Sequence, residues 1–174
     1  MVLEIVLDPE LHGRLVGHLA SSEVEEVAFL AARIDPGGAV VEAVELQVLA
    51  PADFAVQNDY HVRLTDAARG RVIRWAHERS ATLIEAHAHR SRWPAKFSPS
   101  DLFGLGEWVP HVRWRLPNRP YAALVFSDDS FDALAWTGDE RTPQPLAGLR
   151  VGGRLLVPTG LTYAAFKTRH RTQG

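Results

Sequence analysis

Two apolar segments that flank a tight-turn sequence set the strongest constraint on how this chain can fold. Residues 24–34 and 39–49 are rich in β-branched and other apolar side chains, and Asp35-Pro36-Gly37-Gly38 lies between them. Proline and glycine in this arrangement are typical of a turn that reverses the chain. The sequence therefore predicts a β-hairpin over residues 24–49, with a buried first strand.

Helices and hairpins alternate along the rest of the chain. Leu11, Leu15 and Leu19, four residues apart, predict a helix over residues 9–19. Thr65 is a candidate N-cap for a second helix over residues 65–79. This alternation lacks strict βα order and favours an α+β fold, a mixed sheet with helices packed on it. The remaining expected elements are strands at 2–6 and 82–89, a helix from Ser98, a loop at 51–60 and a second hairpin over 121–136.

Length and composition place limits on the class of protein. A chain of 174 residues fits one domain over 1–174, with residues 138–174 as a C-terminal extension because 138–148 is polar and proline-rich. A net charge of −2 argues against nucleic-acid binding, which needs a basic surface. The absence of cysteine excludes disulfides, thiolate zinc sites and a cysteine nucleophile. No membrane span or signal peptide is expected, so the predicted location is the cytoplasm.

His87-Ala88-His89 is the first candidate for chemistry. In the strand expected over 82–89, residues i and i+2 point to the same face, so both imidazoles can reach one cation. The ordinary structural role is that of two hydrogen-bonded strand histidines. So short a motif does not decide between the two roles by itself.

Ser98-Pro99-Ser100-Asp101 is the second candidate. Ser98 is a favoured N-cap residue, Pro99 suits the first helical position, and Asp101 at the third resembles a capping box. A cap does not exclude a ligand, because a carboxylate in the first turn of a helix can point at a cation held by a neighbouring strand. His87, His89 and Asp101 would give three protein ligands, which in zinc sites leaves a fourth position open for water.

A catalytic site of this kind also needs a base close to the metal that does not bind it. Glu23, Glu25, Glu26 and Glu85 are the candidates. Glu85 shares a strand face with His87 and His89. Glu26 stands at the head of the apolar run VAFLAARI, where a carboxylate is unusual, although all three early glutamates also fit a solvated turn.

A glutamate that opens an early buried strand, then His-x-His, then Ser-x-x-Asp at a helix start, resembles the JAB/MPN (JAMM) metalloprotease motif. Glu26, His87, His89, Ser98 and Asp101 carry the resemblance, which covers residues 1–137. The family's usual stretch is His-x-His-Pro, six residues, then Ser-x-x-Asp. Arg90 replaces the proline here, and eight residues rather than seven separate His89 from Ser98. Glu25 is an alternative register for the glutamate.

The resemblance implies a three-layer α/β/α fold of the cytidine-deaminase-like type, with a curved mixed β-sheet flanked by helices. It also implies a zinc-dependent peptidase or isopeptidase with one Zn²⁺ per chain on His87, His89 and Asp101. Glu26 would be the general base, and Ser98 would orient or stabilise the oxyanion. Family substrates are ubiquitin-like or sulphur-carrier proteins, sometimes handled together with activating and conjugating enzymes. The richness in Ala, Val, Arg and Gly suggests a bacterial source.

Three alternative functions are compatible with the same residues. The first is a catalytically silent MPN-like scaffold that binds a protein partner. The second is a metal-free α/β binding domain in which His-x-His and the helix cap coincide. The third, a sulphur-carrier processing enzyme, differs from the peptidase only in its substrate. The basic residues Arg90, Arg92 and Lys96 beside the motif can receive an acidic segment or a C-terminal carboxylate, or form a solvated loop.

Overall fold

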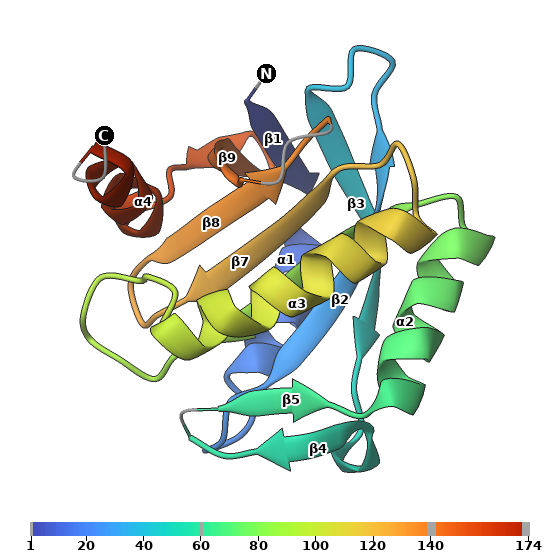
Figure 1. The fold of residues 1–174 in the computed structure, drawn as a ribbon, viewed down its shortest axis with the longest axis vertical. Helices are drawn as coiled ribbons and strands as arrows, with labels where there is room; N and C mark the ends of the chain where they lie inside the picture. The colour runs from blue at the N-terminus through green and yellow to red at the C-terminus, as the bar shows by residue number, and fades with distance from the viewer. Residues whose placement is uncertain (1, 60, 139–141, 172–174) are drawn as a thin grey trace.

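The computed structural model describes residues 2–59, 61–138 and 142–171. Its helices and strands are drawn in Figure 1. The helices are α1 (Pro9–Leu19), α2 (Asp66–Glu78), α3 (Pro99–Arg115) and α4 (Leu161–Arg171). The strands are β1 (Leu3–Leu7), β2 (Val27–Ile34), β3 (Val40–Val48), β4 (Phe54–Gln57), β5 (Val62–Leu64), β6 (Thr82–Ala88), β7 (Tyr121–Phe126), β8 (Phe131–Trp136), β9 (Gln144–Val151) and β10 (Arg154–Leu156).

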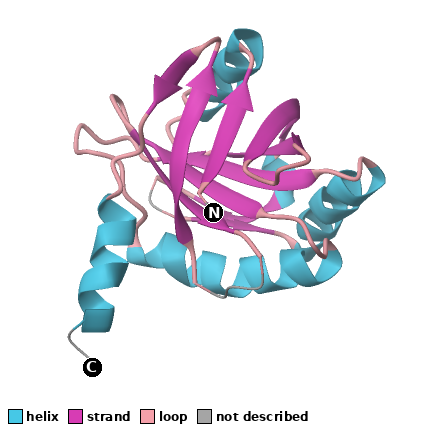
Figure 2. Ribbon diagram, turned by 90° about the horizontal axis from the view of Figure 1, so that it is seen from above, coloured by secondary structure: helices cyan, strands magenta, loops and turns pink. Residues whose placement is uncertain are grey.

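Seven strands of the described chain form a closed sheet. Their order is β1-β3-β2-β6-β7-β8-β9, and β9 pairs back with β1, so the sheet forms a barrel. The β1–β3, β1–β9 and β6–β7 pairs are parallel, and the other pairs around the barrel are antiparallel. β10 folds back on β9 as a further antiparallel strand. Figure 2 shows the curved strands from above, with helices around them.

The three-layer α/β/α architecture that the resemblance implies is therefore wrong. An open layered sheet has two free edges, whereas pairing of Leu3–Leu7 with residues 146–151 joins the two edges here. The sequence does not predict this closure because residues 138–148 resemble a linker. β9 instead begins at Gln144 and accommodates Pro145 and Gly148 within the strand. The polar, proline-rich sequence of 138–148 predicts a linker or surface loop; this prediction is wrong for residues 144–148, and residues 139–141 lie outside the described part of the chain.

Small side chains fill the inside of the barrel. Alternate residues of each strand point inward, and many of them are alanines, such as Ala28, Ala86 and Ala122. The leucines of α1 (Leu11, Leu15 and Leu19) belong to the same buried cluster. Small inward residues leave room for these larger side chains, so the helix expected from the leucine spacing contributes one face to the inner core.

A second apolar cluster covers the outer face of the sheet. It joins β2, β6, β7 and β8 to α2 and α3, with Phe29, Leu83, Trp108 and Tyr121 among its buried members. In Figure 1, α3 runs across the front of the strands, with α1 behind them. Because strand residues alternate, Phe29 and His87 share this outer face, and the first turn of α3 lies over it.

Several local predictions are confirmed. The 24–49 hairpin forms as β2 and β3, and the 121–136 hairpin forms as β7 and β8. Thr65 caps α2, with its Oγ1 accepting a hydrogen bond from the Ala68 N–H at 3.1 Å. The loop expected at 51–60 is wrong in part, because a 3-10 turn and β4 occupy most of it and β4 pairs with β5. Within the part of the chain described, no helix is long and apolar enough to cross a membrane.

β10 lies close against β9 at Gly148. A Cβ atom added there would lie 2.6 Å from Leu155 Cδ1 and 2.9 Å from the Leu156 carbonyl oxygen. We expect Gly148→Ala to lower the free energy of unfolding by about 1–3 kcal/mol, as overpacking does. Gly70→Ala is the matched control, because nothing lies within 4 Å of that position in α2, and it should raise stability by about 0.5–1 kcal/mol. Chemical denaturation measures both, and equal effects would contradict the close approach.

Candidate metal centre

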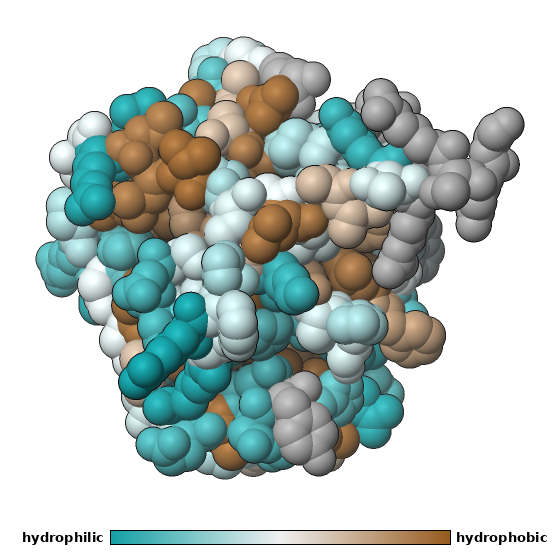
Figure 3. Space-filling model, turned by 90° about the vertical axis from the view of Figure 1, so that its left-hand side faces the viewer, coloured by the Kyte–Doolittle hydropathy of each residue, from teal (hydrophilic) through white to brown (hydrophobic). Residues whose placement is uncertain are grey.

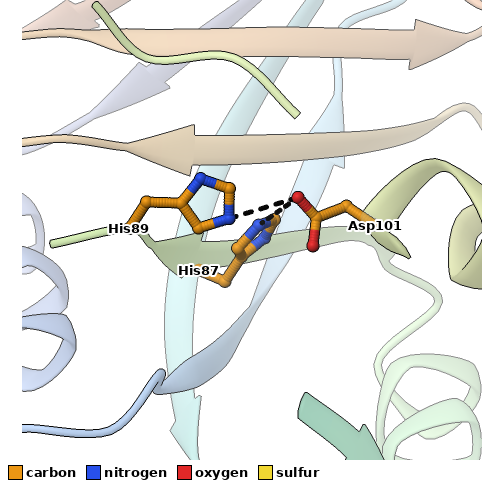
Figure 4. Close-up of side chains that lie close together, drawn as sticks. All are labelled: His87, His89 and Asp101. Carbon is orange, nitrogen blue, oxygen red and sulfur yellow. Dashed lines mark ion pairs between the residues drawn. The ribbon is translucent and has the colours of Figure 1, made fainter. Parts of the chain in front are cut away.

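Three side chains converge at one end of the outer face. His87 and His89 come from β6 and the residue after it, and Asp101 comes from the first turn of α3. The Oδ2 atom of Asp101 lies 3.4 Å from His87 Nε2 and 3.2 Å from His89 Nε2. Figure 4 shows both imidazoles directed at this carboxylate. The structure therefore brings together the three residues that the sequence predicts as metal ligands.

The local sequence explains why these atoms meet. β6 lies between β2 and β7, with His87 opposite Val27 and Val125, and the His89 N–H donates to the Phe126 carbonyl. Both histidines therefore stay in extended backbone and project from the same face. On the helix side, the Ser98 N–H donates to Asp101 Oδ2 at 2.6 Å, and the Asp101 N–H donates to Ser98 Oγ at 3.1 Å. This capping box, as predicted, holds the carboxylate in place.

The spacing of the three groups fits a metal ion. Two ligands about 2.0–2.1 Å from a tetrahedral zinc ion lie roughly 3.3 Å apart, close to the two distances to Asp101. One donor atom from each of the three residues lies within 4.8 Å of the other two. In addition, His87 Nε2 is buried and has no hydrogen-bond partner. An unpaired buried nitrogen is costly, and a cation bound by all three side chains would satisfy it.

The charges of Asp101 and its neighbours favour a cation between the three side chains. Burial alone lowers the pKa of His87, but nearby carboxylates, led by Asp101, outweigh burial and raise that pKa above its usual value. Burial likewise acts to raise the pKa of Asp101, but the imidazoles of His87 and His89 beside it hold that pKa far below the usual range. Asp101 is therefore a carboxylate at neutral pH, and positive charge beside it is favoured.

The structure separates the two rival glutamates. Glu25 is 6% exposed, and its Oε1 lies 3.5 Å from His89 Nε2. Glu26 projects the other way, with its Oε2 3.8 Å from Nε2 of His18 in α1. Adjacent residues of an extended chain point to opposite faces. Glu25 therefore shares its face with Val27, which is the cross-strand partner of His87. The structure does not bring Glu26 to the metal centre, and its register rival Glu25 lies there instead.

Glu25 lies beside the ligand group without belonging to it. Among the described residues, only His87, His89 and Asp101 meet the mutual distance of 4.8 Å. Glu25 Oε2 is buried without a hydrogen-bond partner. Burial raises the pKa of Glu25, partly opposed by the imidazoles of His87 and His89. A carboxylate next to a metal, with one oxygen unpaired and a raised pKa, is suited to exchange protons.

Glu85, another candidate base, is held in a separate network. Tyr121 donates its hydroxyl proton to Glu85 Oε2 at 2.6 Å, and Trp108 Nε1 donates to the Tyr121 oxygen at 2.8 Å. Burial raises the pKa of Glu85. Among the described residues, Glu85 forms no ion pair with His87 or His89, whereas Glu25 contacts His89 at 3.5 Å. These contacts favour Glu25 over Glu85 as the base.

Two cavities meet at the ligand group. One, of about 220 Å³, has His87, Asp101, Glu85 and His61 in its wall. The other, of about 760 Å³, is lined by His89, Ser98 and the apolar side chains of the neighbouring loop and α4. Since the ligands contribute to both walls, a bound metal would be reachable from two sides.

His61 is a site residue that the sequence does not predict. It lies between β4 and β5, and its Nδ1 is 2.9 Å from Ser100 Oγ. His61 therefore joins the β4–β5 ribbon to the first turn of α3, beside the smaller cavity. Nothing in its sequence spacing marks it, because its place depends on how the ribbon folds over the sheet. His77 and His111, which also lack metal-ligand spacing, lie in α2 and α3 outside the ligand group.

The basic loop after His89 is partly engaged within the protein. Arg90 donates to the Ala20 carbonyl at 3.2 Å and pairs with Glu23 at 3.6 Å. Arg92 and Lys96 are exposed, and Trp93 is 80% exposed at the edge of the larger cavity. Figure 3 views the side of the molecule that carries this loop, where apolar patches lie among polar residues.

Comparisons with known proteins give a fold but no family. No protein-family model matches the chain, and no curated protein matches it. Among solved structures, it is similar to the solution structure of a structural-genomics target protein from Desulfitobacterium hafniense. That match has a TM-score of 0.53 and 13% identity, and covers 87% of this chain and 94% of the other. At this identity the similarity shows the fold alone.

Removal of both imidazoles tests the ligand group. We expect the purified protein to hold about one metal ion per chain after incubation with Zn²⁺, and His87→Ala/His89→Ala to hold none, because only Asp101 remains. Elemental mass spectrometry measures the metal. His77→Ala/His111→Ala is the matched control and should bind as the unaltered protein does. Equal metal contents in all three proteins would rule out this group as the site.

Acid should release the metal. His87 binds a metal only as the neutral imidazole, and its pKa is raised above the ordinary value, so protons compete for it in a window that begins above pH of about 6.5. We therefore expect zinc affinity to be high in mildly alkaline solution and to fall steadily as the pH drops through this window. Competition with a chromogenic chelator at several pH values measures the trend. A constant affinity down to acid pH would mean that the histidines are not ligands.

Proposed function

We propose that this protein is a zinc-dependent metallopeptidase or isopeptidase of the JAMM type. The observation that carries the proposal is the three-ligand group of His87, His89 and Asp101 with the buried carboxylate of Glu25 beside it. This is the arrangement of a catalytic rather than a structural zinc site, because three ligands leave a position for water and the base stands outside the ligand set.

The residues around the site have separate roles in this mechanism. A zinc ion at the site would lower the pKa of a bound water to about 7 and polarise the scissile carbonyl. Glu25 accepts the proton of that water and later donates it to the leaving amine, which its raised pKa suits. Ser98 uses its oxygen to cap α3, so its hydroxyl proton remains for the oxyanion. Asp101 keeps its negative charge throughout.

The two cavities support an extended substrate. A peptide that passes over the ligand group can place residues in the smaller cavity on one side and in the larger cavity on the other. The exposed Arg92 and Lys96 add positive charge near the larger cavity. We propose that the substrate is the C-terminal tail of a ubiquitin-like or sulphur-carrier protein, cleaved from a conjugate or a precursor, in a bacterial cytoplasm that also holds activating or conjugating enzymes.

Glu25→Gln is the decisive substitution. We expect it to retain zinc and to reduce cleavage by about 10²–10⁴-fold, the usual contribution of a general base. Glu26→Gln is the matched control, because this neighbour contacts His18 instead and should keep most of the activity. Mass spectrometry of ubiquitin-like proteins that carry either a C-terminal peptide or a lysine isopeptide measures cleavage, with zinc content measured in parallel.

The outcomes separate the competing functions. Loss of activity in Glu26→Gln with full activity in Glu25→Gln would overturn the assignment of the base. Cleavage of short C-terminal adducts alone would indicate a sulphur-carrier processing enzyme. A protein that binds zinc and the modifier but cleaves nothing would be a silent scaffold, and a protein without zinc would be a metal-free binding domain.

A further inference from the structure

The loop that joins the two halves of the metal centre is held by the C-terminal helix. Residues 89–98 run from the second histidine ligand to the cap of α3, and they contain one residue more than the JAMM pattern and no proline after the second histidine. A longer loop has more conformations to lose, so contacts must fix it if Asp101 is to lie beside the histidines. Those contacts come from the start of α4, from Thr159 just before it, and from Ser130, whose Oγ accepts a hydrogen bond from the Ala95 N–H at 2.9 Å.

Hydrogen bonds connect Thr162 of α4, and Thr159 just before that helix, to the loop. The Phe97 N–H donates to Thr162 Oγ1 at 3.0 Å, and this bond is buried. Thr159 Oγ1 donates to the Ala95 carbonyl at 2.7 Å. Phe97 is the residue before Ser98, whose own N–H donates to Asp101 Oδ2. The chain of contacts from Thr162 to the ligand carboxylate thus passes through only two residues.

A buried carboxylate holds the start of α4 in turn. Asp132 of β8 is 0% exposed, and its Oδ1 and Oδ2 accept hydrogen bonds from the Gly160 and Thr162 N–H groups, each at 3.0 Å. Its Oδ1 also accepts from the Ala133 N–H at 3.0 Å. Buried polar atoms are costly unless hydrogen bonds satisfy them, and these backbone donors satisfy both carboxyl oxygens of Asp132. Asp132 does not belong to the ligand group. Its hydrogen bonds to the Gly160 and Thr162 N–H groups explain why a carboxyl group lies in this buried strand.

We propose that α4 completes the metal centre, with Thr162 and Asp132 as positioning residues that hold the ligand-bearing loop. α4 also forms one wall of the larger cavity through Leu161, Thr162, Ala165 and Phe166. The start of α4 is then part of the site rather than an extension of the domain. The proposal depends on metal binding at His87, His89 and Asp101, and not on the reaction catalysed there.

Thr162→Val tests the proposal most directly. Valine has nearly the same shape as threonine but no acceptor for the Phe97 N–H. The loop therefore loses this hydrogen bond while the packing of the side chain remains. We expect zinc affinity, measured by competition with a chromogenic chelator, to fall about 10- to 100-fold, as it does when a supporting contact to a ligand is removed. The absorption spectrum of the Co²⁺-substituted protein should shift as well. Thr162→Ser, which keeps the hydroxyl, should restore both.

Thr168→Val is the matched control on the same helix. Its hydroxyl donates to the Ala164 carbonyl of α4 itself, so the substitution should leave zinc affinity and the Co²⁺ spectrum unchanged. If Thr162→Val does not fold, Thr159→Val removes the bond to Ala95 at a less buried position and should weaken zinc binding in the same direction. Three outcomes would overturn the proposal. The folded valine variant could bind zinc as tightly as the unaltered protein does. Thr162→Ser could bind it as weakly as Thr162→Val, or the unaltered protein could bind none.

Discussion

Pairing of β1 with β9 is the interaction on which the rest of the structure depends. It joins the first strand of the chain to a strand that begins at Gln144, and the double contact of Arg150 with Glu4, at 2.7 and 3.1 Å, lies on the same seam. Closure turns one face of each barrel strand toward the inner core. The other face of β2, β6, β7 and β8 is left for α2 and α3, and the candidate metal centre lies at the end of that outer layer.

Asp101 is at once part of a helix cap and a candidate metal ligand. Its Oδ2 accepts from the Ser98 N–H and also faces both imidazoles. The hydrogen bonds of the cap restrict the Asp101 carboxylate to one direction. Asp101 can therefore serve as a rigid ligand without another residue to hold its side chain. The same coupling means that the start of α3 and the ligand geometry cannot change independently.

The sequence predicts which three side chains converge, because each depends on local geometry, whereas the barrel depends on long-range pairing. His87 and His89 share a face in any strand, and Asp101 completes a capping box at any suitable helix start. The choice between the two adjacent glutamates is harder, because the pairing of Val27 with His87 decides which one faces the candidate ligands, and the sequence does not show this pairing. Barrel closure escapes prediction for the same reason. β9 contains Pro145 and resembles a linker until its partner β1 is known.

Closure between Glu4 and Arg150, 146 positions apart, also has a consequence for biosynthesis. A ribosome delivers the chain from its N-terminus, so β1 can pair with β3 early but keeps an open edge until β9 emerges. An unpaired strand edge invites pairing with other chains. During translation, the edge of β1 that pairs with β9 therefore stays unpaired until Gln144–Val151 has been synthesised.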